Sequence, residues 1–161
     1  MRVQKFSSSG EYLLDFGRRS GAFPGFRSPA GIVWFDGVIW VADSIHKVIF
    51  RFDGSGNYLG KMAEGALHYP ESLRLDSAPI NGVPASGGRI AGATGFGQRL
   101  LVADTSRLLV IDPSSGRIDE IGSLGRAGGR IVGASVDRNA NILIANHANS
   151  EINIMSRMDD L

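Results

Sequence analysis

Short apolar runs, separated by polar turns that contain glycine, follow one another along most of the chain. The runs "VIWVAD" (38–43) and "VIFRFD" (48–53) are rich in β-branched and aromatic residues, and "DGSGNY" (53–58) supplies the turn after them. Runs of this kind between Gly, Asp and Ser residues predict short β-strands. No segment combines a helical apolar spacing with capping residues, so we expect little helix.

The strand pattern repeats. The stretch "GGRIAGATG" (87–95) recurs about 41 residues later as "GGRIVGASV" (128–136), and "VIFRFDGSGNYLGKM" (48–62) aligns with "RVQKFSSSGEYLLDF" (2–16). Each repeat contains four short strands. Four strands at a period of 40–45 residues are typical of a β-propeller blade, whose two faces are buried only by neighbouring blades.

The sequence therefore predicts an all-β propeller with about three and a half four-stranded blades. This amounts to half of a six- to seven-bladed propeller, or to a fragment of one. The chain is expected to form a single propeller segment. Its blade units cover approximately residues 1–22, 28–66, 87–125 and 128–161, with an insert at 67–86.

Two segments compete for the innermost strand of the middle blade. Residues 69–77 begin with a proline, Pro70, that repeats Pro29. In residues 89–94, Gly92 precedes Val102 of the next strand by 10 residues, the same spacing as between Gly31 and Val41 in the first blade. We favour residues 89–94 on this spacing, and the alternative stays open.

The first complete unit carries a more specific pattern. It has a Phe-Gly pair, a Gly-rich link, the sequence Pro-x-Gly-Ile, a Val-Ala-Asp-Ser corner and a strand that ends in Phe-Asp (16–53). This stretch resembles the NHL-repeat family of β-propellers, which is related to the YWTD and gluconolactonase-like six-bladed propellers. His46 and Lys47 stand where the family has its Asn-His pair. The resemblance implies a repeat module that binds proteins or other ligands, or that acts as a scaffold.

The composition restricts the function classes. Seventeen basic and 16 acidic residues in 161 give a net charge of +1, which does not favour nucleic-acid binding. The chain has no cysteine, which excludes disulfides and thiolate chemistry. No apolar run approaches the ~18 residues of a membrane span, and no targeting segment distinguishes a secreted from a cytoplasmic location.

One corner, "VADSIHK" (41–47), brings a carboxylate, a hydroxyl and an imidazole close together in the sequence. The repeat aligns Asp43 with Asp104 and Asn146. An Asx side chain at a strand end typically accepts hydrogen bonds from nearby backbone amides. We therefore expect these residues to cap turns, and we predict no catalytic residue.

Several residues remain candidates for binding. Two arginines precede inner strands and suit a carboxylate or phosphate group, and two histidines lie at blade corners. Two phenylalanines in the link "SGAFPGF" (20–26) belong to an aromatic group that is expected mostly in the core between blades, with exposure for binding a partner as the alternative. Trp34 and Trp40 are also expected in the core. The candidate binding residues are Arg89, Arg130, His46, His147, Phe23 and Phe26.

The alternative function is enzymatic. Some propeller hydrolases and lyases, of the lactonase type, bind calcium or zinc on the propeller axis through inner-strand side chains. The inner strands expected here, "AGIVW", "IAGAT" and "IVGAS", carry no His, Asn, Asp or Glu. We therefore predict no metal and no cofactor, with calcium or zinc retained only for this alternative.

The predicted blades do not close a circle. The chain begins with half a blade, and its final blade lacks a fourth strand, which residues 11–16 of another copy are able to supply. Two copies would then make six to seven blades. The other interpretation, which the sequence leaves open, is that a longer parent chain completes the propeller. The expected partners are therefore a protein or a second copy, without nucleic acid.

Overall fold

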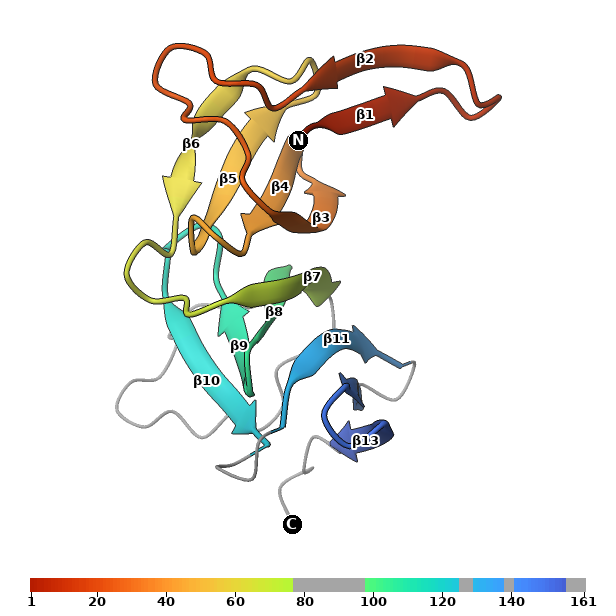
Figure 1. The fold of residues 1–161 in the computed structure, drawn as a ribbon, viewed down its shortest axis with the longest axis vertical. Coiled ribbons are helices and arrows are strands. Elements are labelled where there is room, and N and C mark those ends of the chain that lie inside the picture. Colours follow the sequence, from red (N-terminus) through yellow and green to blue (C-terminus); the bar gives the residue numbers. More distant parts are fainter. Residues whose placement is uncertain (77–97, 125–128, 138–140, 156–161) are drawn as a thin grey trace. The chain divides into compact units, whose positions relative to one another are not determined.

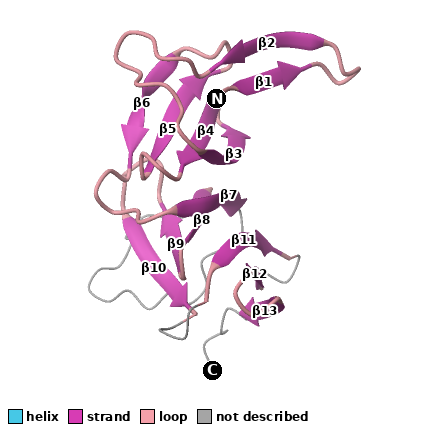
Figure 2. Ribbon diagram, viewed as in Figure 1, coloured by secondary structure: helices cyan, strands magenta, loops and turns pink. Residues whose placement is uncertain are grey.

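A computed structural model describes residues 1–76, 98–124, 129–137 and 141–155. The chain divides into two compact units, Met1–Leu73 and Arg74–Leu161, each described by itself below. The described residues form strands and turns only, as Figure 2 shows, which confirms the all-β prediction. Because this part of the chain has no helix, it offers none that is able to cross a membrane.

The first unit contains a hairpin and a complete four-stranded sheet (Figure 1). The hairpin pairs β1 (Val3–Phe6) with β2 (Tyr12–Phe16). The sheet has the simple antiparallel order β3-β4-β5-β6. Its strands are β3 (Pro29–Phe35), β4 (Val38–Asp43), β5 (Val48–Asp53) and β6 (Tyr58–Met62).

The remaining strands form two further antiparallel sheets. One has the order β10-β9-β8-β7, and the other the order β11-β12-β13. β7 spans Pro70–Asp76 and therefore contains the boundary between the two units. The other strands are β8 (Arg99–Asp104), β9 (Arg107–Ile111), β10 (Ile118–Ser123), β11 (Ile131–Val136), β12 (Ile142–Asn146) and β13 (Glu151–Met155).

The repeat in the sequence is also a repeat in strand register. In the β3–β6 sheet, Gly31 lies opposite Ala42 beside a register shift. In the β11–β13 sheet, Gly133 lies opposite Ala145 beside the same kind of shift. A bulge that recurs at the same position in two copies belongs to the structure of the repeat and is not a local irregularity of one strand. The sequence alignment of the inner strands is therefore correct for these two sheets.

The inner strand of the β7–β10 sheet differs from the favoured interpretation. Pro70–Asp76 occupies it, beside β8, although the spacing in the sequence places this segment in an insert. Residues 89–94, which the spacing favoured, lie outside the described residues. Burial explains the choice: Leu73 is 2% exposed, and the buried carboxylate of Asp76 accepts a hydrogen bond from Arg99 on β8 at 2.9 Å. Strand pairing thus follows these contacts and not the spacing.

An aromatic cluster forms the core of the first unit. The ring of Phe23 lies 5.0–5.2 Å from those of Phe26, Phe50, Phe52 and Tyr58. Phe23 is only 3% exposed and Phe26 only 7%. This confirms the expectation that these aromatic residues belong to the core, and the alternative that both are exposed for binding is wrong. The link that carries them folds back over the sheet, because large aromatic rings are stabilised most by burial.

The two tryptophans of β3 and β4 have opposite environments. Trp40 is 4% exposed and stacks on Phe35 at 5.3 Å, as expected for a core residue. Trp34 is 57% exposed, so its assignment to the core is wrong. β3 alternates between exposed and half-buried positions, and Trp34 falls on its exposed side.

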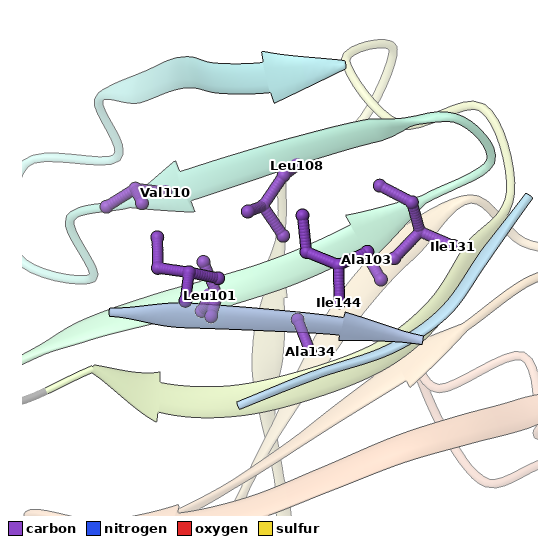
Figure 3. Close-up of a cluster of buried hydrophobic side chains, with 8 residues drawn as sticks. Leu101, Ala103, Leu108, Val110, Ile131, Ala134 and Ile144 are labelled. Carbon is purple, nitrogen blue, oxygen red and sulfur yellow. The ribbon is translucent and has the colours of Figure 1, made fainter. Parts of the chain in front are cut away.

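A second, aliphatic core lies in the second unit. Four side chains from β8 and β9 pack against four from β11 and β12, as Figure 3 shows. The members are Leu101, Ala103, Leu108, Val110, Ile131, Ala134, Ile142 and Ile144. One side of the β11–β13 sheet thus covers strands β8 and β9.

Candidate functional site

The carboxylate of Asp43 is fully buried at the end of β4. One of its oxygens accepts hydrogen bonds from the backbone N–H groups of Arg27 (2.8 Å) and Ser28 (3.0 Å). The other accepts from those of Ile45 (3.2 Å) and His46 (3.0 Å). Backbone amides hold a carboxylate strongly in this way. Asp43 therefore caps the turn, as its repeat position indicates.

Ser44 and His46 also bond to the backbone. The Ser44 hydroxyl donates to the Pro70 carbonyl at 2.6 Å. The Nε2 atom of His46 lies 3.0 Å from the Gly25 carbonyl, and its ring packs edge-on against Phe50 at 5.4 Å. Because a carbonyl only accepts, Nε2 carries the proton in this bond. The three polar side chains thus fasten three different backbone segments.

Of the two equivalent corners in the second unit, the Asn146 corner repeats the backbone bonds of Asp43, whereas at the Asp104 corner the acceptor binds a side chain. The side-chain oxygen of Asn146 accepts hydrogen bonds from the N–H groups of Arg130 (3.3 Å) and Ala148 (3.2 Å). Asp104 is buried and bonds the guanidinium of Arg107. All three equivalent acceptors are therefore occupied in the structure of their corners.

Two of the predicted binding residues meet at the Asn146 corner. The N–H of His147 donates to the Arg130 carbonyl at 2.8 Å, and both side chains are exposed. His46, by contrast, is half-buried, and Arg89 lies outside the described residues. Arg130 and His147 therefore offer one small exposed polar surface, the part of the predicted set that the structure brings together.

Metal-ligating side chains do not gather in the described part of the chain. Within residues 1–76 and the three later described ranges, no group of three or more His, Asp or Glu side chains is close enough to hold an ion.

A hollow of about 430 Å³ opens in the first unit, beside the end of β2. Its polar rim includes Arg2 and Asp15, whose side chains form an ion pair at 3.3 Å. The size is within the range of small-ligand pockets. Its lining residues are Arg2, Asp15, Phe16, Gly17, Arg18, Ser20, Phe23, Phe52, Gly56, Asn57 and Tyr58. Sequence reasoning missed this hollow because its residues come from four separate segments.

The hairpin of the first unit exposes an aromatic pair. Phe6 and Tyr12 lie opposite each other in the register, and their rings meet edge-to-face at 6.0 Å. Phe6 is 51% exposed and Tyr12 55%. Together with the exposed Gln4 on the same strand, these residues form what we call the hairpin face. Contiguous exposed apolar patches are more common where proteins bind partners than elsewhere on protein surfaces.

The last strand of the second unit exposes an aliphatic pair. Ile152 is 69% exposed and Ile154 66%. They lie beside Ala145 and Leu143 of β12, respectively, with which they are paired in the register. Because side chains alternate along a strand, these four residues share the side of the sheet opposite the core. We call them the β13 face.

Comparisons with known proteins identify the fold. No protein-family model matches the chain, and no curated protein matches it either. Among solved structures, a streptogramin B lyase structure is similar to 96% of this chain with a TM-score of 0.59 and 15% sequence identity. The chain spans 47% of the length of that neighbour. The likeness, with the four-stranded antiparallel sheets, shows that the chain has a partial β-propeller fold.

Proposed function

We propose that this chain is an NHL-type propeller segment that acts by binding a protein partner and not by catalysis. The observation that carries the proposal is the pair of exposed apolar faces, Phe6 with Tyr12 on the hairpin and Ile152 with Ile154 on β13. Exposed large apolar side chains in groups are typical of protein interaction surfaces.

The use of the polar corner residues supports the same proposal. Asp43, Ser44 and His46 are the carboxylate, hydroxyl and imidazole that lie closest together in the sequence. Each of the three side chains forms a hydrogen bond with a backbone atom. A nucleophile and its base require a direct hydrogen bond in a productive geometry.

Site-specific photo-cross-linking tests the proposal. A photoreactive phenylalanine analogue replaces Phe6 or Ile154, one at a time, in the intact chain within cells that produce it. We expect each position to give a discrete protein cross-link. Ile45, which is 44% exposed outside both faces, is the matched control and should give none. The absence of any cross-link from both faces would remove the basis of the binding function.

The second candidate is a propeller enzyme of which this chain is one half. It is favoured by the fold likeness to a protein whose name is streptogramin B lyase and by the 47% coverage of that protein. Calcium or zinc near the axis would serve such an enzyme. Incubation of the purified chain with a B-type streptogramin, with each ion and with a chelator, tests this. Turnover that the chelator abolishes would replace the binding function by the enzymatic one.

A further inference from the structure

The β13 face is exposed at repeat positions that another sheet buries. Ile152 lies opposite Ala145 in the register, as Leu108 lies opposite Ala103 in the β7–β10 sheet. Leu108 is nevertheless 0% exposed, whereas Ile152 is 69% exposed.

The next pair along the strand repeats the contrast. Ile154 lies opposite Leu143, as Val110 lies opposite Leu101, and Val110 is 4% exposed against 66% for Ile154. In the β7–β10 sheet these positions are covered by β11 and β12. Among the described residues, no sheet covers them on β13.

The inner strands show the same difference. A Cβ atom added to Gly31 would lie 2.4 Å from the backbone nitrogen of Leu73 in the next inner strand. At Gly133, the repeat equivalent, an added Cβ would meet only Ala145 of its own sheet, at 3.8 Å. The β11–β13 sheet therefore retains a glycine suited to a close neighbour, and the described chain places no neighbour there.

The hairpin face is the counterpart. Phe6 and Tyr12 are paired beside a register shift, as Phe52 and Tyr58 are paired beside one. Phe52 is 1% exposed because Phe16 and Phe23 pack on it at 4.8 and 5.0 Å. Phe6, in the same place of its repeat, is 51% exposed.

The two faces are equivalent to the two surfaces that meet where one sheet of this chain packs on another. In the second unit, the β8–β9 side that bears Leu108 and Val110 packs on the β12 side that bears Ile142 and Ile144. In the first unit, the hairpin side that bears Val3 packs on the β5 side that bears Phe50 and Phe52. The β13 face is equivalent to the side of β9 that bears Leu108 and Val110. The hairpin face is equivalent to the side of β5 that bears Phe52.

We propose that the β13 face of one copy of this chain binds the hairpin face of a second copy. Each copy has one face of each kind, so two copies satisfy all four faces through two identical head-to-tail contacts. The length supports this partner, because the chain spans 47% of a solved propeller and two copies would span nearly all of it. The inference rests on the proposed binding function and names its partner.

Sedimentation of the purified chain and of two single variants tests the proposal. The unaltered chain is expected to sediment at twice the mass of one chain. Ile154→Asp and Phe6→Asp are each expected to weaken the dimer at least about 30-fold, as the loss of a central interface side chain does. Ile45→Asp, the control, should leave the dimer unchanged. Circular dichroism confirms folding, which both variants should retain since each altered side chain is more than half exposed.

Mixing the two variants decides the orientation. A mixture of Ile154→Asp and Phe6→Asp contains one pair of unaltered faces, so dimer is expected to return in the mixture although neither variant dimerises alone. A contact of β13 with β13, or of hairpin with hairpin, would give no such return. Interfaces of ordinary size have dissociation constants from about 1 μM downwards. An unaltered chain that stays monomeric at about 100 μM, or a mixture of the two variants that stays monomeric, would overturn the proposal.

The cross-linking experiment separates this inference from the proposed function. A cross-link from Phe6 or Ile154 to another copy of the chain supports both. A cross-link to a different protein alone retains the binding function and overturns the self-association. Failure of the self-association alone therefore leaves a cross-link to another protein, whereas failure of the binding function leaves no cross-link.

Discussion

The carboxylate of Asp43 holds together three segments of the first unit. Its four acceptor contacts join the link at Arg27 and Ser28, the end of β4, and the turn at Ile45 and His46. A buried acceptor of several backbone amides is expensive to remove, because each amide left without a partner remains desolvated. The corner is therefore a structural centre of the unit.

Two substitutions separate the capping role from a requirement for charge. Asp43→Asn retains one acceptor oxygen, as Asn146 does in its own corner, and is expected to lower the free energy of unfolding by about 1 kcal/mol. Asp43→Leu leaves all four amides without an acceptor and is expected to cost at least about 3 kcal/mol. Urea titration followed by circular dichroism measures both. Equal costs would contradict a role in capping.

At the residue scale, the sequence predicted what depends on local geometry. The alignment of Asp43 with Asp104 and Asn146 indicated turn capping, because a strand-end acceptor bonds amides a few residues away. For Phe23 the sequence left a core position and an exposed position both open, because burial of that ring depends on how a Gly-rich link folds back over a sheet. The partner of His46, the Gly25 carbonyl, is distant in sequence and was missed for the same reason.

At the scale of elements, the approach of β3 to β7 depends on a glycine. Gly31→Ala would place a Cβ 2.4 Å from the Leu73 nitrogen and 2.8 Å from its Cβ. Backbone cannot give way as a flexible side chain does, so we expect a loss of about 3 kcal/mol in the free energy of unfolding. Gly133→Ala, the matched control, meets only an ordinary contact and should change stability by less than about 1 kcal/mol. Thermal unfolding of both variants measures the difference, and similar losses would contradict the close approach.

The turn between β9 and β10 depends on pH. The hydroxyl of Ser114 donates to Asp112 at 2.6 Å, and the backbone N–H of Ser114 donates at 2.8 Å. These bonds stabilise the ionised form and lower the pKa of Asp112 to about 2. The folded-state pKa is depressed, so the stabilisation is present above pH ~4, the unfolded pKa, and is lost as pH falls towards 2.

Ser114→Ala tests this dependence. It removes the largest contribution and is expected to move the pKa of Asp112 towards its usual value, with a loss of about 1 kcal/mol near neutral pH after solvent screening. Ser55→Ala in the equivalent turn is the control, because the Asn57 side chain is the main cause of the lowered pKa of Asp53. Carboxyl NMR titration between pH 1.5 and 6, a window that brackets the ordinary Asp pKa of about 3.9, follows both groups. A pKa of Asp112 that stays near 2 without the Ser114 hydroxyl would contradict the assignment.

The strands were predicted more accurately than their partners. Apolar runs rich in β-branched and aromatic residues, with turn residues between them, identified β4, β5, β8 and β12 because these signals lie within each strand or beside it. The choice between residues 70–76 and 89–94 depended on which segment pairs with β8. The spacing between residues in the sequence does not show which of the two pairings is more stable. Pairing was decided by the burial of Leu73 and by the bond between Asp76 and Arg99, contacts that no single strand contains.

At the scale of the whole molecule, the two apolar faces link stability to concentration. If two copies bind through these faces, only the folded chain associates, so mass action raises the melting temperature with concentration. A tenfold rise adds about 1.4 kcal/mol per dimer, which is expected to raise the melting temperature of a chain of this size by about 2 °C. Phe6→Asp and Ile154→Asp should melt at a temperature that does not depend on concentration, whereas Ile45→Asp should behave as the unaltered chain does. Calorimetric scans of all four proteins at three concentrations make this comparison. A melting temperature of the unaltered chain that is the same at all three concentrations would show that the exposed faces do not join copies of this chain. The reason is that a dimer unfolds to two separate chains, so its melting temperature must depend on concentration.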